Sequence, residues 1–504
     1  MKKFVLNTIF LISAFAVFGQ AIDQSFSKKK MRKDLKIFKE IRVKANSGLY
    51  KYRTKAQIDS IYNWANLAIE KSSSYRDFYN IICKLTDFEG SLHNETSLPD
   101  KILKKLQQES YGYFPYPVKW NQGNWIVNFK NDKIPLGSKV MAINSLPISE
   151  IILNLQKYYT TDGLNLSGKR IGIRKHFAKY YRLNYGQEKE FNITFIRNGS
   201  NFKENVIVEG VSYSNYYKNF NNRHSKPYDN IYYSELKESE KYNFKILNTK
   251  TGILTINTFS MGDETTVEHK KYAQFLDSIF VKIKSINLKN LVIDVRQNSG
   301  GNDPNDVLTY SYLTSRKFKE SKQAWIRFKK IPFIKYIDIS VPKFLRPLGV
   351  GKFNRHFQKR FPIEKDGKYF ISKTASEMKI REPNKNAFKG NIYLLISPAV
   401  ASAGSLFASM VSGNKKTIVI GEESMGGYFG HNGHTSLGYV LPKSGIITDF
   451  SIDNIQQDVV DRKNQLAKRG IIPNYKISQS YQGFLENKDT QMNFTLDLIK
   501  KNGD

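Results

Sequence analysis

A change from strand-like to helix-like apolar pattern within twenty residues constrains the fold more than any other feature of the sequence. Residues 392–396 form a continuous apolar run, and an apolar helical pattern begins at Ser402 after a short turn. A second apolar run, 291–296, leads into the double glycine Gly300-Gly301, where the backbone can approach a ligand closely. Strands that alternate with helices in this way predict an α/β fold.

Further elements extend this predicted core over residues 241–484. Apolar runs at 252–256 and 417–421 predict two more strands, and the spacing of apolar residues over 264–284 predicts a helix. Residues 315–388 are rich in Lys and Phe without clear periodicity, so we expect an insertion in the core. A C-terminal helix is expected within 485–504.

The part of the chain before the core divides into four predicted segments. Residues 1–20 begin with lysines, continue as an apolar stretch and end in small residues. This pattern is typical of a secretory signal peptide, cut near Gly19 or Ala21, and predicts an exported protein in the periplasm or outside the cell. Residues 28–105 predict a helical cap, residues 112–208 a small, partly open β-barrel, and residues 209–240 a polar linker.

The charge of the chain is strongly positive, with 79 Lys and Arg against 45 Asp and Glu and a formal net charge of +34. The basic residues are spread along the whole chain and no nucleic-acid-binding signature accompanies them, which favours a solvated surface over nucleic-acid binding. Such a surface could associate peripherally with an anionic cell envelope. The single cysteine, Cys83, excludes an internal disulfide and a Cys-rich metal site.

Ser402 is a residue that could carry chemistry. A serine at the start of a helix lies beside free backbone N–H groups, where an oxyanion would be stabilised; it could equally be an ordinary helix N-cap. A serine nucleophile needs a neighbouring base, and a histidine imidazole suits that role best. Candidate oxyanion donors are the N–H of Ala403 and that of Gly300 or Gly301.

His431 and His434 form a second cluster, in the glycine-containing run 430–434. They could be metal ligands, but zinc requires at least three protein ligands and the sequence offers no evident third. A polar loop that lines a substrate cleft is the preferred interpretation. The sequence predicts neither a metal nor a cofactor.

Four stretches, taken in order, resemble the C-terminal processing peptidases and tricorn-core-like serine peptidases. These are Asn290 to Gly301, Ala401 to Phe407, Gly421 to Tyr428 and Arg469 to Asn474. Residues 135–145 resemble a PDZ segment of the kind these enzymes carry. The resemblance implies a crotonase-like, ClpP-like α/β peptidase core with a PDZ-like domain over 112–208, and polypeptide substrates.

The resemblance also implies roles for single residues. Ser402 corresponds to the nucleophile. His93 corresponds to the upstream base of the tricorn-like branch, because Gly427 stands where the Ser-Lys branch has its lysine. Without the resemblance, His93 would be interpreted as a solvated loop residue. Asn474 stands where the family usually has Asp. The acid of the triad is left open among Asp449, Asp453, Asp458 and Asp461. The sequence therefore predicts an exported serine endopeptidase that cleaves unfolded or C-terminal peptide segments. A catalytically inactive peptide-binding protein is the main alternative, and a carbohydrate- or retinoid-type binding role a weaker one.

Overall fold

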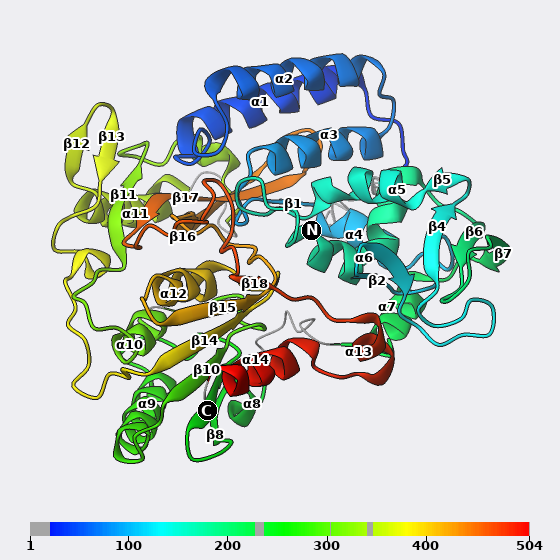
Figure 1. Cartoon of the computed structure of the whole chain (residues 1–504). Coiled ribbons are helices and arrows are strands. Elements are labelled where there is room, and N and C mark those ends of the chain that lie inside the picture. The colour runs from blue at the N-terminus through cyan, green and yellow to red at the C-terminus, as the bar shows by residue number, and fades with distance from the viewer. Residues whose placement is uncertain (1–20, 227–235, 303, 340–345, 503–504) are drawn as a thin grey trace, which may run out of the picture.

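Three six-stranded sheets organise the protein (Figure 1). The computed structural model describes residues 21–226, 236–302, 304–339 and 346–502. The predicted signal peptide lies outside these residues. No helix in the described residues is long and apolar enough to cross a membrane.

The first sheet is the predicted α/β core. Its strand order is β18-β15-β14-β10-β9-β8, and all neighbours are parallel except the edge strand β8. Its strands are β8 (Tyr242–Ile246), β9 (Thr251–Ile256), β10 (Asn290–Asp294), β14 (Asn391–Ile396), β15 (Thr417–Gly421) and β18 (Tyr475–Lys476). The four strands predicted in the core are confirmed to within two residues. A parallel sheet needs cover on both faces, and this explains the continuous apolar runs.

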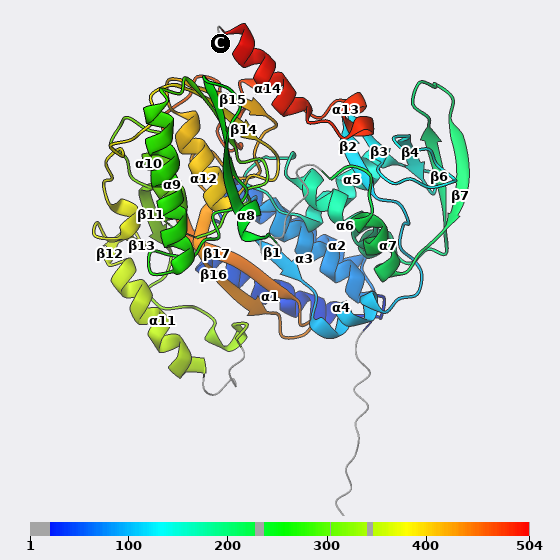
Figure 2. The ribbon, with the colours of Figure 1, turned by 90° about the horizontal axis from the view of Figure 1, so that it is seen from below.

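Helices cover both faces of this sheet. Helices α9 (Val267–Ser285), α10 (Asn305–Ser311) and α12 (Ser402–Ser412) pack on one face, where Phe407 contacts the cluster that contains Leu394. Helix α14 (Thr490–Lys501) packs on the other face through Ile499. Figure 2 shows α9 and α12 on one side of β14 and β15, and α14 on the opposite side. The predicted C-terminal helix is therefore present, preceded by the short α13 (Tyr481–Glu486).

The second sheet joins the N-terminal helices to the core. Its order is β1-β17-β11-β13-β12, with β16 also paired to β17. The strands are β1 (Glu95–Ser97), β11 (Ser321–Ile326), β12 (Ile363–Lys365), β13 (Lys368–Phe370), β16 (Asn432–Val440) and β17 (Ile447–Gln457). The segment 315–388 is thus not merely an insertion, because β11 pairs directly with β17. It also contains α11 (Arg346–Arg360).

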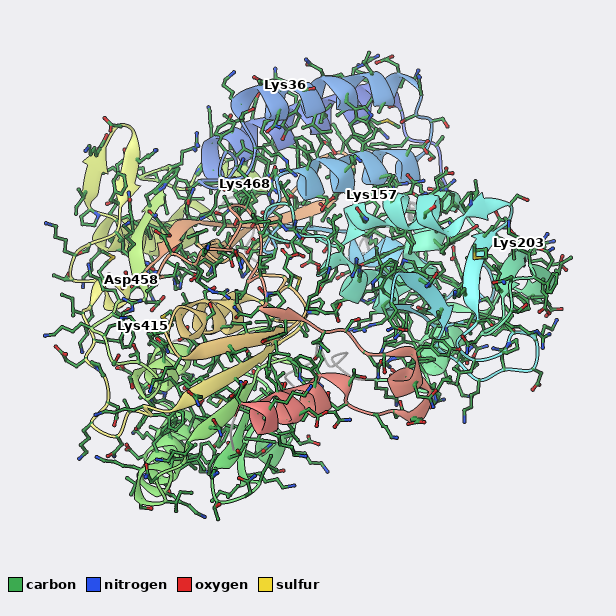
Figure 3. All side chains as sticks on the ribbon, viewed as in Figure 1. Lys36, Lys157, Lys203, Lys415, Asp458 and Lys468 are labelled. Atoms are coloured by element: carbon green, nitrogen blue, oxygen red, sulfur yellow. The ribbon has the colours of Figure 1, made fainter. Side chains whose placement is uncertain are left out.

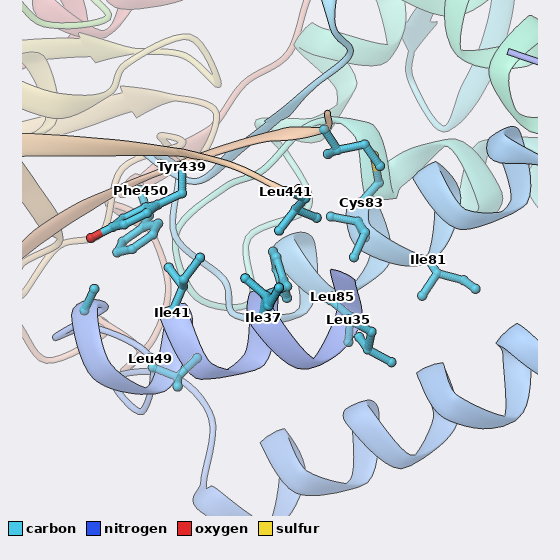
Figure 4. Close-up of a cluster of buried hydrophobic side chains, with 14 of the residues drawn as sticks. Leu35, Ile37, Ile41, Leu49, Ile81, Cys83, Leu85, Tyr439, Leu441 and Phe450 are labelled. Atoms are coloured by element: carbon cyan, nitrogen blue, oxygen red, sulfur yellow. The ribbon is translucent and has the colours of Figure 1, made fainter. Parts of the chain in front are cut away.

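The predicted N-terminal helices are present and pack on this second sheet. They are α1 (Lys28–Ala45), α2 (Lys55–Glu70), α3 (Tyr75–Phe88) and the short α4 (Asp100–Gln107). Figure 4 shows Ile41 of α1 and Leu85 of α3 in the apolar cluster that contains Tyr439 and Phe450 of the two longest strands. Cys83 is buried in the same cluster, where a free cysteine packs as a small apolar side chain.

The third sheet contains β2 (Val118–Asn121), β3 (Asn124–Val127), β4 (Lys139–Ile143), β5 (Leu146–Pro147), β6 (Glu190–Ile196) and β7 (Glu204–Glu209). It surrounds α5 (Ile148–Leu155), a short 3-10 turn (Gln156–Tyr158) and α6 (Lys169–Tyr185). The expected strands of this region are confirmed, and the PDZ-like assignment stays a prediction.

Two helices beside the third sheet were not predicted. Helix α7 (Tyr213–Asn221) lies in the segment expected to be a linker and buries Tyr216 and Phe220. Helix α6 has no clear apolar stripe because several of its charged residues are buried. Arg182, for example, is buried and forms ion pairs with Asp23 and Glu109. Because charged residues occupy buried positions of α6, the spacing of its apolar residues does not reveal the helix. The short α8 (Glu238–Lys241) leads into the core.

Most of the excess positive charge lies on the surface. Lys36, Lys203, Lys415 and Lys468 are exposed and belong to separate parts of the molecule (Figure 3). This distribution agrees with a solvated lysine-rich surface rather than one concentrated basic patch.

Candidate active site

Ser402 occupies a strained position at the first residue of α12. Its φ of 49° lies in the left-handed region, which residues other than glycine rarely adopt. The N-cap of the helix is Ala401, with φ −150°, and no side chain caps the helix. The interpretation of Ser402 as an ordinary N-cap is therefore wrong. Its hydroxyl points instead toward an imidazole.

His93 and Ser402 meet although 309 positions separate them, with His93 Nε2 lying 3.3 Å from Ser402 Oγ. His93 precedes β1, whose Glu95 pairs with Asp449 of β17. The strand β14 and the turn after it place Ser402 at the carboxyl end of the parallel sheet. Two sheets built from distant parts of the chain thus bring the two predicted residues within hydrogen-bonding reach.

The surroundings of His93 keep its imidazole neutral. Burial lowers the pKa of His93 to about 4; the backbone of Asn432 opposes this shift and His434 adds to it. The ring of His431, 5.6 Å from that of His93, is itself buried, and burial lowers its pKa well below the ordinary value. A neutral imidazole is the form that can accept a proton from a serine hydroxyl.

No carboxylate of the described residues hydrogen-bonds to the remaining ring nitrogen of His93, since its buried Nδ1 has no hydrogen-bond partner there. Asp453 is fully buried and faces Arg360 at 3.7 Å. Asp458 faces Arg316 at 3.3 Å, and Asp461 is exposed. The expectation that one of these three aspartates orients His93 is therefore not supported.

Asp449 differs from the other three candidates, because it lines the same cavity as His93 and Ser402. Burial, together with the nearby Glu95 and Asp338, raises the pKa of Asp449 to about 6. Even so, Asp449 makes no hydrogen bond to His93 in this structure. Its role as the acid stays a prediction.

The predicted oxyanion donors lie beside Ser402, but one of them is already engaged. The N–H of Gly300 donates to Asn298 Oδ1 at 2.9 Å, which corrects its assignment as a donor to the oxyanion. Gly301 and Ala403 line a cavity with Ser402 and His93. Ala403 lies in the first turn of α12, where backbone N–H groups lack helical partners. These two residues remain as candidate donors.

Gly300 has a different function, which is to permit close packing against the nucleophile. Its φ is 120°, and a Cβ atom there would lie 2.7 Å from Ser402 Cβ. We expect Gly300→Ala to lower kcat by about a hundredfold, because it displaces Ser402. Gly123→Ala is the matched control, since Gly123 has φ 89° and no atom within 4 Å of the added methyl group. Equal activities of the two variants would contradict this role.

Two cavities meet at Ser402 and His93. The larger, about 710 Å³, is lined by Ser299, Ala401, Met425 and side chains of α3 and α6. The smaller, about 260 Å³, is lined by His431, His434 and Glu320. Both histidines thus line the site, as expected of a cleft loop. The described residues contain no group of three or more His, Cys, Asp or Glu side chains that could hold a metal ion.

The sequence analysis missed the residues that hold the site together. Asn298 is fully buried. Its side-chain amide accepts from the Gly300 N–H and donates to the Ile256 carbonyl, and its backbone carbonyl accepts from the Ala401 N–H. Asp162 is also buried and contacts the backbone beside His93. Asn298 stands in the double-glycine motif and could have been identified there, whereas no local signal marks Asp162.

Comparisons with known proteins agree with this geometry. The family model described as Peptidase family S41 matches residues 250–477. No curated protein matches the sequence.

Solved structures of CPAF share the fold. Mature CPAF has a TM-score of 0.58 at 12% identity, covering 94% of this chain and 99% of that one. A serine-to-alanine mutant of CPAF has a TM-score of 0.60 at 12% identity, covering 91% and 94%. At this identity the likeness shows the fold alone. Residues 250–477, which contain Ser402 and both glycines of the turn beside it, are thus similar to peptidase family S41.

Proposed function

We propose that this protein is a serine endopeptidase in which Ser402 is the nucleophile and His93 the general base. The observation that carries the proposal is the 3.3 Å approach of His93 Nε2 to the hydroxyl of a serine held in a strained conformation. The family match supports hydrolysis of peptide bonds. The alternative of an inactive peptide-binding protein of this fold does not account for the approach of these two side chains.

The arrangement supports acyl transfer through a covalent intermediate. His93 takes the proton of Ser402 as the Oγ atom attacks the peptide carbonyl, and then gives it to the leaving amine. Backbone N–H groups of Ala403 and Gly301 stabilise the oxyanion, a contribution of about 3 kcal/mol for each donor. Water then attacks the acyl-enzyme, with His93 again as the base, and hydrolysis releases the second product.

The substrates proposed are unfolded or C-terminal segments of polypeptides. Ser402 and His93 lie between two cavities rather than on a convex surface. An extended chain can enter such a site, but a folded domain cannot present its backbone there. Capture of a peptide by the PDZ-like region, as an added strand, would fit the same substrates.

A serine-directed fluorophosphonate tests the proposed nucleophile directly. The wild-type protein should be labelled, and the Ser402→Ala variant should not. Hydrolysis of an unfolded protein such as casein is measured on the same samples. Failure of the folded wild type both to label and to hydrolyse would favour the inactive peptide-binding alternative.

The pH dependence of activity should reflect the unusual pKa of His93. A base with a pKa near 4 stays neutral at about pH 5, where an ordinary histidine with a pKa of about 6.5 is mostly protonated. Because protonation abolishes the base, the fall in kcat/KM that is due to His93 should come as the pH drops toward about 4, and it should remain there in an Asp162→Asn variant, which lacks the buried carboxyl group whose pKa burial raises to about 6. A profile of kcat/KM against pH measures this, and an acid limb near 6.5 would contradict the prediction.

Export is proposed from the N-terminal pattern alone. Residues 1–20 carry the basic, apolar and small-residue succession of a signal peptide. The mature protein would then act in the periplasm or outside the cell, with its basic surface against an anionic envelope. The mass of the protein recovered from an exporting host should show cleavage near Gly19 or Ala21.

A further inference from the structure

A loop between the 3-10 turn Gln156–Tyr158 and α6 contacts the backbone on both sides of His93. This loop, residues 160–165, is called the clamp loop here. The Thr160 hydroxyl donates to the carbonyl of Asn94 at 2.6 Å and lies 3.3 Å from that of Leu92. The Asp162 carboxylate accepts from the Leu92 N–H at 3.0 Å. Two side chains of the clamp loop therefore hold both neighbours of His93.

A backbone contact strengthens the same attachment. The N–H of Gly163 donates to the carbonyl of Gly90 at 2.7 Å. A Cβ atom on Gly90 would lie 2.8 Å from the Gly163 carbonyl oxygen, so the two chains are in close contact. The loop from Gly90 to Asn94, which carries His93, is thus fixed along its whole length.

The clamp loop also contacts the segment 424–427, which hydrogen-bonds to the chain just before Ser402. The second oxygen of Asp162 accepts from the Gly427 N–H at 2.9 Å, and the Asn165 amide donates to the Ser424 carbonyl at 2.7 Å. Met425 and Gly426 in turn donate to the carbonyl of Val400, two residues before Ser402. One carboxylate therefore connects the backbone beside the base to the segment that supports the nucleophile.

Burial makes these contacts strong and specific. Asp162 and Asn165 are each 1% exposed. A hydrogen bond to a buried charged group contributes more than one at the surface, and its loss leaves the partner unsatisfied. No carboxylate of the described residues fixes the His93 ring through Nδ1, so the orientation of the ring depends on the backbone that carries His93 and on the nearby backbone of Asn432.

We propose that Thr160 and Asp162 are positioning residues that hold His93 at its working distance from Ser402, in place of a carboxylate on the imidazole. The proposal rests on the proposed function of these two residues as base and nucleophile. It assigns the clamp loop, which lies outside the region matched by the family model, a part in catalysis.

The test compares three substitutions of hydroxyl-bearing residues. Thr160→Val removes the hydroxyl at constant shape and should lower kcat about tenfold to a hundredfold with little change in KM, because a small misplacement of a base is costly. Thr160→Ser keeps the hydroxyl and should restore most of the activity. Thr194→Val is the matched control, since the Thr194 hydroxyl donates to Asn205 Oδ1 between β6 and β7 of the third sheet. The rate of fluorophosphonate labelling should change in parallel with kcat.

Each outcome decides the proposal. Loss of kcat in Thr160→Val, with rescue by serine and an unchanged melting temperature, supports it. Equal activity of Thr160→Val and the wild type, or equal loss in the valine and serine variants, overturns it. If Thr160→Val fails to fold, Asp162→Asn replaces it. A lower kcat with little change in KM in Asp162→Asn then supports the proposal, and a wild-type kcat overturns it. Failure of the proposed function is distinguishable, because the wild type would then show neither labelling nor hydrolysis, or Ser402→Ala would retain the wild-type activity.

Discussion

Peptide hydrolysis is expected to fall by about a millionfold in kcat in a Ser402→Ala variant, while the protein still folds. The change removes the atom that attacks the peptide carbonyl and leaves the backbone around it intact. Alanine fits the space of serine, and the fold loses only the hydrogen bond to His93. The measurement is single-turnover hydrolysis of a fluorogenic peptide, with the melting temperature recorded on the same sample.

Ser409→Ala provides the matched control on the same helix. Ser409 is fully buried and its hydroxyl has no hydrogen-bond partner among the described residues, so its removal should change neither activity nor stability. His93→Gln should lose nearly as much activity as Ser402→Ala, and the double variant little more, because a nucleophile and its base act as one unit. Retention of full activity in Ser402→Ala would exclude the proposed mechanism.

Loss of one partner of the buried ion pair between Arg42 and Glu89 should have the largest effect on stability. The Arg42 side chain is fully buried and donates to both carboxylate oxygens of Glu89, at 2.8 and 2.7 Å. Asn46 and Asn94 donate to the same carboxylate. Arg42→Met should therefore lower the free energy of unfolding by about 3–5 kcal/mol, since it leaves a buried acid without its cation.

Two further variants identify the cause of this loss. Arg32→Met removes one partner of an ion pair with Glu70 that is about half exposed, and it should cost less than about 1 kcal/mol. The double variant Arg42→Met with Glu89→Leu should recover part of the stability, because neither charge remains buried. Urea denaturation followed by tryptophan fluorescence measures all three. A cost for Arg42→Met no larger than that for Arg32→Met would contradict the prediction.

Much of the core could be predicted because its strands are buried on both faces. Residues 291–296 and 392–396 read as continuous apolar runs, which a central parallel strand requires. The nucleophile candidate followed from the same pattern, since the turn after β14 leads directly into α12. His93 came from the family resemblance alone, because a single histidine in a polar loop carries no structural signal of its own.

The parts that could not be predicted depend on contacts between distant segments. The burial of Arg182 in α6 is explained by Asp23 and Glu109, whose positions the sequence does not reveal. The strand β11 within the expected insertion forms only because β17 pairs with it. The engagement of the Gly300 N–H by Asn298 likewise depends on the conformation of a turn rather than on composition.

The pairing of β1 with β17 can form only after most of the chain has been made. At ribosomal rates of about 5–20 residues per second, the 309 residues between base and nucleophile take roughly 15–60 seconds to synthesise. Even then the growing chain lacks β17, which holds the strand that follows His93. A nascent chain that includes Ser402 but ends before Ile447 contains both side chains and lacks this pairing, so the second sheet is completed around His93 only in the last part of synthesis.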